Sequence, residues 1–299
     1  MQLSIIMPVF NRQDAGNRAL RKAVAQNVAA EIIIIDDGST PPFYVSPDIS
    51  AAGIRIIRLD ENRGAAAARN VGFAAAKGEW IALLDSDDYW LPGTLKPRLD
   101  AAMRDFAHDR NPMRCYAGGF VLANRITGKS QARMPVESSD PADFAGGCWF
   151  CPGSTILLHR DSLKRVGDFD PALRRLEDFD WFLRFALAGG SLKVFDEIVA
   201  VVEIGAKVSV DRLAVVEEHL RNKYLSSASG TRIPFRLARR LRAYLDIEHA
   251  SSHVAQREWI TAIYFLARSV MFVPRLSLHT RRFWSYPAVP EFHAPTTPD

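Results

Sequence analysis

Acidic side chains gather in three short segments of the sequence, Asp36–Asp37, Asp85–Asp88 and Glu177–Asp180. The first two segments follow directly on apolar runs of strand length, Ile32–Ile35 and Ile81–Leu84, and the third stands at a predicted helix start. Carboxylate oxygens clustered in this way suit Mg²⁺ or Mn²⁺, which share their coordination positions with water and a phosphate-bearing substrate. A single aspartate most often caps a helix or forms a turn. Three acidic segments at one edge of a sheet favour a functional site.

The order of the predicted elements explains why these segments would meet. The expected strands are Ser4–Val9, Ile32–Ile35, Ile54–Leu59 and Trp80–Leu84, and the expected helices between them are Ala15–Val28 and Ala65–Lys77. Short, almost continuously apolar strands that alternate with helices are typical of a mostly parallel sheet covered on both faces. Ligands of such sheets bind beyond the carboxyl ends of the strands, where two of the acidic segments lie.

The rest of the chain has a different character. Further strands are expected at Met113–Arg125, Ser154–His159, Leu192–Phe195 and Ile198–Glu203, with helices at Pro92–His108, Asp161–Val166 and Phe179–Ala188. The formal net charge is −2 over residues 1–204 and +6 over residues 205–299, which places a boundary near Gly205. Beyond it the sequence predicts helices at Ser209–Leu225, Pro234–Glu248 and Val254–Phe272, followed by an irregular tail.

The composition excludes several classes of protein. Hydrophobic residues make up 48% of the 299 and charged residues 24%, which excludes a disordered or fibrous chain. We expect no signal peptide, because the first apolar run has no basic region before it and meets Pro8 and Asn11 too soon. We expect no membrane-spanning helix, because no stretch approaches the roughly 18 apolar residues that a span requires. Three cysteines argue against a disulfide scaffold and for a reducing compartment. A net charge of +4 is too small to indicate nucleic-acid binding. These features predict a cytoplasmic protein.

Five motifs then resemble those of one enzyme family. They are Ser4–Arg12, Ile35–Ser39, Glu61–Asn70, Leu84–Pro92, and Val166–Asp170 followed by Glu177–Arg184. In this order they resemble family 2 glycosyltransferases with the GT-A fold, over about residues 3–204. Any single motif would be weak, whereas five in sequence are specific.

The resemblance implies an α/β protein of GT-A type, with a Rossmann-like, mostly parallel sheet flanked by helices and a C-terminal helical extension. Residues 1–204 would form the catalytic domain, with a nucleotide-sugar-binding half at 1–108 and an acceptor-side half at 109–204. Residues 205–299 would be the helical extension with its irregular tail.

The resemblance also assigns roles on the donor side. The backbone around Pro8 and Phe10, together with the carboxylate of Asp37, would hold the nucleotide base. Arg69 would face the nucleotide, and Asp85 would reach the ribose. A UDP sugar is the expected donor.

The reaction itself needs a base and a charge acceptor. A hydroxyl group is a poor nucleophile at neutral pH, so a carboxylate must take its proton, and the resemblance assigns this role to Asp178. The departing nucleoside diphosphate gathers negative charge, which a divalent cation neutralises. The resemblance places this Mn²⁺ or Mg²⁺ on Asp87, with Asp88 sharing the role. It implies inversion at the sugar carbon and a saccharide or glycolipid acceptor, as in cell-surface polysaccharide or glycolipid synthesis.

Two other classes of function remain as alternatives. A non-catalytic protein of the same fold would bind a nucleotide sugar without transferring it, and would not need both Asp87 and Asp178. A nucleotidyltransferase would require a glycine-rich phosphate loop after the first strand, and Asn11–Asp14 is not glycine-rich.

A basic segment at Arg232–Arg242 forms a separate signal. Its arginines at 232, 236, 239 and 240 fall near one side of a predicted helix, opposite an apolar stripe that includes Leu237 and Leu241. Such a helix either lies on an anionic membrane, here the inner face, or packs on the catalytic domain with a solvated side. The apolar segment Trp259–Val273 would then be the partner of that surface or part of the core. The arginines are not interleaved with stacking aromatics, so no nucleic-acid partner is expected.

Two pairs of metal-ligand residue types have simpler interpretations. Cys148 and Cys151 have redox-motif spacing but lack the βαβ context, so we expect buried thiols that shape the acceptor side. His249 and His253 lie four residues apart without the glutamate of a zinc-protease motif, so we expect a solvated helix face.

Overall fold

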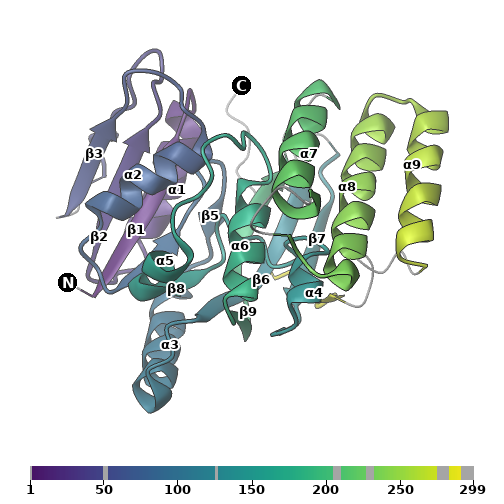
Figure 1. Cartoon of the computed structure of the whole chain (residues 1–299). Coiled ribbons are helices and arrows are strands. Elements are labelled where there is room, and N and C mark those ends of the chain that lie inside the picture. Colours follow the sequence, from purple (N-terminus) through teal and green to yellow (C-terminus); the bar gives the residue numbers. More distant parts are fainter. Residues whose placement is uncertain are drawn as a thin grey trace.

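The computed structural model of the chain describes residues 2–49, 53–124, 127–204, 210–226, 232–274 and 283–290 (Figure 1). Its strands are β1 (Leu3–Val9), β2 (Ala30–Asp36), β3 (Ile54–Arg58), β4 (Trp80–Leu83), β5 (Tyr89–Trp90), β6 (Arg114–Asn124), β7 (Ser130–Pro135), β8 (Leu157–His159), β9 (Ser191–Ile204) and β10 (Trp284–Ser285). Its helices are α1 (Gln13–Val24), α2 (Ala65–Ala75), α3 (Leu95–Asp109), α4 (Pro141–Phe144), α5 (Arg160–Val166), α6 (Glu177–Leu187), α7 (Val210–Leu225), α8 (Phe235–Ala255) and α9 (Trp259–Phe272).

The strands form one sheet with a parallel half and a mixed half. Strands β3, β2, β1 and β4 lie side by side, and every pairing among them is parallel. The antiparallel strand β8 connects β4 to β6, which pairs with β9 in parallel and with β7 antiparallel. Strand β10 adds to the edge at β7, and the short β5 pairs with β9. The predicted α/β fold is confirmed, with its parallel order concentrated in the first half.

Both faces of the central strands β1, β2 and β4 are buried, which explains why these strands are almost continuously apolar. Ile5 and Ile32 belong to a core on one face, which also contains residues of α1 and α3. Ile6 and Ile33, the next residues along the same strands, belong to the core on the other face, against α2 and α6. Successive side chains thus serve opposite layers of the molecule.

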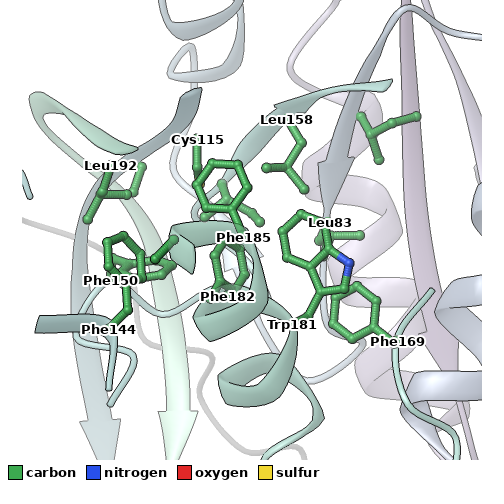
Figure 2. Close-up of a cluster of buried hydrophobic side chains, with 14 of the residues drawn as sticks. Leu83, Cys115, Phe144, Phe150, Leu158, Phe169, Trp181, Phe182, Phe185 and Leu192 are labelled. Atoms are coloured by element: carbon green, nitrogen blue, oxygen red, sulfur yellow. The ribbon is translucent and has the colours of Figure 1, made fainter. Parts of the chain in front are cut away.

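Helix α6 is held by a dense aromatic cluster (Figure 2). Trp181 lies nearly parallel to Phe169, with ring centroids 5.5 Å apart, and Phe182 meets Phe150 edge-on at 4.9 Å. Phe185 is fully buried in the same cluster. Each such side chain contributes about 1.5–3 kcal/mol through burial. The cluster therefore fixes the position of the acidic residues at the start of α6.

The C-terminal helices α7, α8 and α9 stand side by side on one flank of the sheet (Figure 1). The predicted stripe of α8, which includes Leu237 and Leu241, is buried in one core with Phe179 and Leu183 of α6. Helix α9 packs against α8. Within the described ranges, every helix is too short or too polar to cross a bilayer.

Several predicted boundaries differ from the structure, and three of the differences change the architecture. The strands expected at 192–195 and 198–203 are one strand, β9, with an irregular register opposite Gly118 and Gly119. Helix α8 continues to Ala255 instead of ending at Glu248. The expected irregular tail contains β10, because its residues pair with the β7 edge. The boundary predicted near Gly205 and the start of the helix expected from Ser209 lie outside the described residues.

Candidate active site

The loop that follows β4 is a tight turn with three crowded carboxylates. The amide of Asp88 donates to the carbonyl of Asp85 at 3.1 Å, which closes the turn. The carboxylate of Asp85 accepts a hydrogen bond from Arg69 at 2.8 Å. The carboxylate of Asp87 forms an ion pair with Arg12, also at 2.8 Å, and remains partly exposed. The two acids of the Asp-x-Asp motif, Asp85 and Asp87, are thus each paired with one arginine.

The third carboxylate, that of Asp88, points inward. It accepts hydrogen bonds from the Ser154 hydroxyl at 2.6 Å and from the Glu203 amide at 3.1 Å. Burial raises the pKa of Asp88 well above its ordinary value, and the charges of Asp85 and Asp87 raise it further. Burial and then Asp85 also raise the pKa of Asp87. The loop therefore holds more negative charge than its neighbours neutralise, a condition that favours a bound cation.

Asp178 stands in the first turn of α6. Leu176, the residue just before the helix and two positions before Asp178, has a left-handed backbone with φ of 58°, an uncommon and strained conformation for a bulky residue that is often found at functional sites. The pKa of Asp178 is raised to about 7, first by burial and then by the charge of the neighbouring Glu177, whereas Arg69 opposes the rise. A carboxyl group with a pKa near neutrality is well matched to accept a proton from a hydroxyl group.

Arg69 joins the two acidic regions. Its buried guanidinium donates to Glu177 and to Asp85, both at 2.8 Å, and lies 5.7 Å from the ring of Phe169. The resemblance suggests a nucleotide contact for this residue; the structure places its guanidinium between the β4 loop and the start of α6. Arg69 therefore orients carboxylates on both sides of the site.

One cavity of about 390 Å³ brings the acidic loop and the start of α6 together. Its lining residues are Asp85, Asp87, Asp88, Phe120, Leu122, Arg133, Cys148, Trp149, Cys151, Pro152, Gly153, Asp178, Val202, Glu203 and Trp284. Four of the acids expected at the site therefore share one space. Pro8, Phe10, Asp37 and Arg69 do not line it.

Asp37 lies outside this cavity, in the loop after β2. Its carboxylate accepts hydrogen bonds from the side chain of Asn62 at 2.9 Å and from the amides of Arg63 and Gly64, each at 2.8 Å. The segment 62–64, which donates these hydrogen bonds, leads directly into α2, and α2 carries Arg69. An ionised carboxylate has about four acceptor positions, so three bonds leave one for a further donor.

The end of β1 lies beside Asp37. Phe10 is 42% exposed, and Pro8 is half-buried within the strand. A small cavity of about 110 Å³ lies between the loops that follow β1 and β2, and residues 11–13, 39–41 and 43 line it. Arg12 lines this cavity and pairs with Asp87, so it connects the β1 end to the acidic loop.

The donor set fits a cation that is shared with a phosphate group. Mg²⁺ and Mn²⁺ commonly bind through one or two carboxylates and complete their shell with water and substrate phosphates. Asp87 is accessible for this purpose, and Asp85 lies beside it in the same turn. Across the described ranges, no group of three or more His, Cys, Asp and Glu side chains forms a complete protein site. The arrangement therefore suits a substrate-linked cation better than a structural metal.

Several residues of the site were not predicted from the sequence. Gly153 is required for space, because a Cβ at this position would lie 1.9 Å from the Oδ2 atom of Asp85. Ser154 donates to Asp88. Arg133 and Trp284 form part of the cavity wall. Only the Pro152–Ser154 turn carries a visible sequence signal; the other contacts depend on strand pairing.

The cysteine and histidine pairs have opposite outcomes. Cys148 and Cys151 are free thiols that line the cavity, and burial raises the pKa of both. The expectation of a solvated face for His249 and His253 is wrong. Both rings are buried and stack on Phe265, at 4.6 and 5.4 Å between centroids, because α9 covers this side of α8.

The fold and site define an α/β protein with strand-end carboxylates around one cavity. Residues 4–167 match the sequence profile of glycosyl transferase family 2. This match covers more than half of the chain, and the chain belongs to that family. The crystal structure of S. aureus TarS 1-349 in complex with UDP-GlcNAc has a similar fold, with a TM-score of 0.54 and 20% identity over 90% of this chain and 82% of TarS. The GT-A-type fold is thereby confirmed.

Curated relatives extend the comparison. An uncharacterized glycosyltransferase of Haemophilus influenzae is 31% identical over 192 residues, or 61% of each chain. The succinoglycan biosynthesis protein ExoU of Rhizobium meliloti is 38% identical over 212 residues, or 62% of this chain and 57% of ExoU. The putative colanic acid biosynthesis glycosyl transferase WcaA of Escherichia coli is 28% identical over 209 residues, or 68% of this chain and 72% of WcaA. The matched part thus spans about three fifths of the first two relatives.

Proposed function

We propose that this protein is a metal-dependent, inverting glycosyltransferase. It moves a sugar from a UDP sugar to a hydroxyl of a saccharide or glycolipid in cell-surface polysaccharide or glycolipid synthesis. The observation that carries the proposal is the common cavity of Asp178 and the Asp85–Asp88 loop. The names of ExoU and WcaA support the polysaccharide context, and the bound ligand of TarS supports the donor class.

Asp178 is the general base in this proposal. With a pKa of about 7, a substantial fraction of its carboxyl groups is ionised at neutral pH. The ionised form accepts the proton of the acceptor hydroxyl as that oxygen forms its bond to the sugar carbon and the bond to the diphosphate oxygen breaks. The cavity walls Trp149 and Trp284 limit the access of water, which would otherwise compete as acceptor.

The donor is held at the parallel half of the sheet. Asp37 has an acceptor position available for a ring N–H of uracil, and the exposed face of Phe10 stacks on the base. Asp85 contacts the ribose, with its carboxylate oriented by Arg69. Asp87, with Asp88 behind it, holds the divalent cation on the diphosphate. The cation neutralises charge on the leaving group when bound.

The test is a binding screen with nucleoside diphosphates in the presence and absence of Mn²⁺, read by thermal shift and calorimetry. We expect UDP with Mn²⁺ to stabilise the protein more than UDP alone. Asp87→Ala should remove the effect of Mn²⁺, whereas the surface variant Asp100→Ala should retain it, because Asp100 pairs with Lys96 far along α3.

The outcomes separate the competing functions. No binding of any nucleoside diphosphate would overturn the donor proposal. Binding of UDP without transfer to any acceptor in a panel of saccharides and glycolipids would favour the non-catalytic protein of the same fold. A Mn²⁺ effect that persists in Asp87→Ala would remove Asp87 from the cation site.

We also propose a cytoplasmic location with peripheral contact to the inner face of the membrane. The proposed contact surface is the outward side of α9 and not the basic side of α8. Arg236 and Arg240 of α8 pair with Asp140 and Asp143, at 2.8 and 3.0 Å, so the predicted basic side is partly used within the molecule. Apolar side chains cover the outward side of α9. They are Trp259, Ile260, Ile263, Tyr264 and Met271, between 57% and 87% exposed.

An anionic bilayer is the partner that this α9 surface fits. Arg239 donates to the carbonyl of Phe272, and the guanidinium of Arg242 lies 5.7 Å from its ring, so basic groups border the end of the apolar surface. A second copy of the chain would bring two such basic borders together, whereas anionic lipid complements them.

Sedimentation with vesicles that contain phosphatidylglycerol tests the contact. We expect Ile260→Glu combined with Ile263→Glu to abolish binding, and Val215→Glu to leave it unchanged, because Val215 is equally exposed but lies on α7. Equal binding by both variants, or a dimer of the parent protein that the α9 variant dissociates, would overturn this assignment.

A further inference from the structure

Arg133 differs in charge from every other ionisable wall residue of the active-site cavity. The cavity is lined by Asp85, Asp87, Asp88, Asp178 and Glu203, and Arg133 is the one arginine or lysine among its described lining residues. Glu203 is neutralised by Arg18 at 2.8 Å. The arginine therefore stands as a separate positive feature.

No carboxylate neutralises Arg133 within the described ranges. Its guanidinium donates only to the side-chain oxygen of Gln131, at 3.2 and 3.3 Å, and lies 4.4 Å from the ring centroid of Trp284. Burial lowers the pKa of Arg133, as expected for a cation that is partly removed from water without an anionic partner. An arginine in such a position is suited to pair with an anion supplied from outside.

The position of Arg133 is fixed by the C-terminal strand. Trp284 of β10 is buried and donates from its indole nitrogen to the carbonyl of Trp149 at 2.6 Å. The neighbouring Phe283 stacks on Trp149 at 4.9 Å, and β10 pairs with β7, the strand that carries Arg133. The guanidinium thus rests on an aromatic platform, which limits its rotamers and orients its planar face.

The sheet order places Arg133 on the acceptor side. The cation and nucleotide residues lie at β1, β2 and β4, whereas β8 and β6 separate β4 from β7. Arg133 is paired across the β6–β7 hairpin with Phe120, which also lines the cavity. The cavity therefore has an acidic end for the donor and an end with one arginine beside apolar and aromatic groups.

We propose that Arg133 binds an anionic group of the acceptor sugar, either the carboxylate of a uronic acid or a phosphate ester. This inference deepens the proposed function and rests on it. A planar guanidinium forms two parallel hydrogen bonds with either oxyanion. Arg133 is a specificity residue here, because it recognises the acceptor and takes no part in the proton transfer.

The experiment compares matched sugars on protein that is saturated with UDP and Mn²⁺. Methyl glycosides of glucose, galactose and mannose are compared with the corresponding methyl uronides and with the 6-phosphates of the same sugars, using ligand-observed NMR titration. We expect at least one anionic series to bind about tenfold or more tightly than its neutral counterpart. Arg133→Gln should remove this preference, and Arg133→Lys should restore part of it. Lys129→Gln, which removes a charge from the same hairpin outside the cavity, should retain it.

The results distinguish this inference from the proposed function. Failure of the parent protein to bind UDP would overturn the proposed function itself. Normal UDP binding with equal affinity for neutral and anionic sugars would overturn only the role of Arg133. A loss of UDP affinity in Arg133→Gln with unchanged thermal unfolding would instead assign the residue to the donor diphosphate. A preference for uronides or for phosphates identifies which anion the acceptor carries.

Discussion

Two acidic loops at the same edge of the sheet use their carboxylates in opposite ways. After β2, Asp36 accepts hydrogen bonds from the amides of Ser39 and Phe43, at 2.9 and 3.1 Å, and an ion pair from Arg58. Burial opposes ionisation of Asp36, but these partners outweigh it and lower its pKa. After β4, the pKa of Asp88 is instead raised.

The difference shows what separates an anchoring acid from a functional one. Both loops follow buried parallel strands, and both contain adjacent aspartates. In the first, backbone amides and Arg58 surround the carboxylate of Asp36, so its charge stabilises the turn. In the second, the carboxylates of Asp85, Asp87 and Asp88 are neighbours of one another, so part of their negative charge is not neutralised by the protein and suits a bound cation. The neighbours of an acid, more than its place at a strand end, indicate its role.

The largest expected effect is that of Asp178→Asn. Like Asp88, Asp178 has a raised pKa, so it extends the contrast with Asp36. We expect transfer to slow by about 10²–10⁴-fold, since an amide cannot accept the hydroxyl proton. The parent protein should lose activity as pH falls below about 7, where Asp178 becomes protonated. Initial rates with a UDP sugar across pH measure both effects. Asp168→Asn, an exposed acid ten residues earlier, is the control; a variant Asp178→Asn as fast as the parent would exclude the base role.

The anchoring loop is tested by Asp36→Asn. The amide would place an NH₂ group against N–H donors and leave Arg58 without its carboxylate, so we expect unfolding to become easier by about 3 kcal/mol. Urea unfolding measures this change. Asp60→Asn, at an exposed position nearby, should change stability little. Equal stability of both variants would break the comparison between the two loops.

The smallest expected effect is an increase in stability, whereas Asp36→Asn is expected to lower it. Asp88→Asn relieves charge repulsion, so we expect a gain of about 0.5–2 kcal/mol at neutral pH, as at other active sites that trade stability for function. Because the pKa of Asp88 is raised by folding, ionisation destabilises the parent as pH rises above the ordinary carboxyl range. The gain should therefore shrink as pH falls and disappear below the ordinary pKa of 3.8, where Asp88 is protonated in both the folded and the unfolded state. Unfolding measured at several pH values would contradict this if the gain were constant.

The sequence predicts the parallel half of the fold well, because its strands are short apolar runs between clear helices. Ile32–Ile35 lies within β2, and Trp80–Leu83 is β4 itself. The position of the Asp85–Asp88 loop also follows from strand order, since parallel strands place their carboxyl ends at one edge. The place of Asp178 in the same cavity depends on how α6 packs against the sheet.

The remainder of the site depends on contacts that no local pattern reveals. Arg133 and Trp284 are about 150 residues apart and meet only through the pairing of β7 with β10. Two-residue strands such as β10 carry no periodic signal. The interior position of Arg69 likewise follows from Glu177, 108 residues further along. Long-range pairing of this kind is set by tertiary packing, which propensity does not encode.

Strand β10 completes the cavity wall with residues from late in the chain. The hydrogen bond from Trp284 to Trp149 spans 135 positions, and α7, α8 and α9 lie between its two ends along the chain. During synthesis the Asp85–Asp88 loop is therefore made well before the part of the cavity wall that contains Trp284. In the proposed function, an insertion in α8 or α9, outside the Asp85–Asp88 loop, would change which acceptors are recognised.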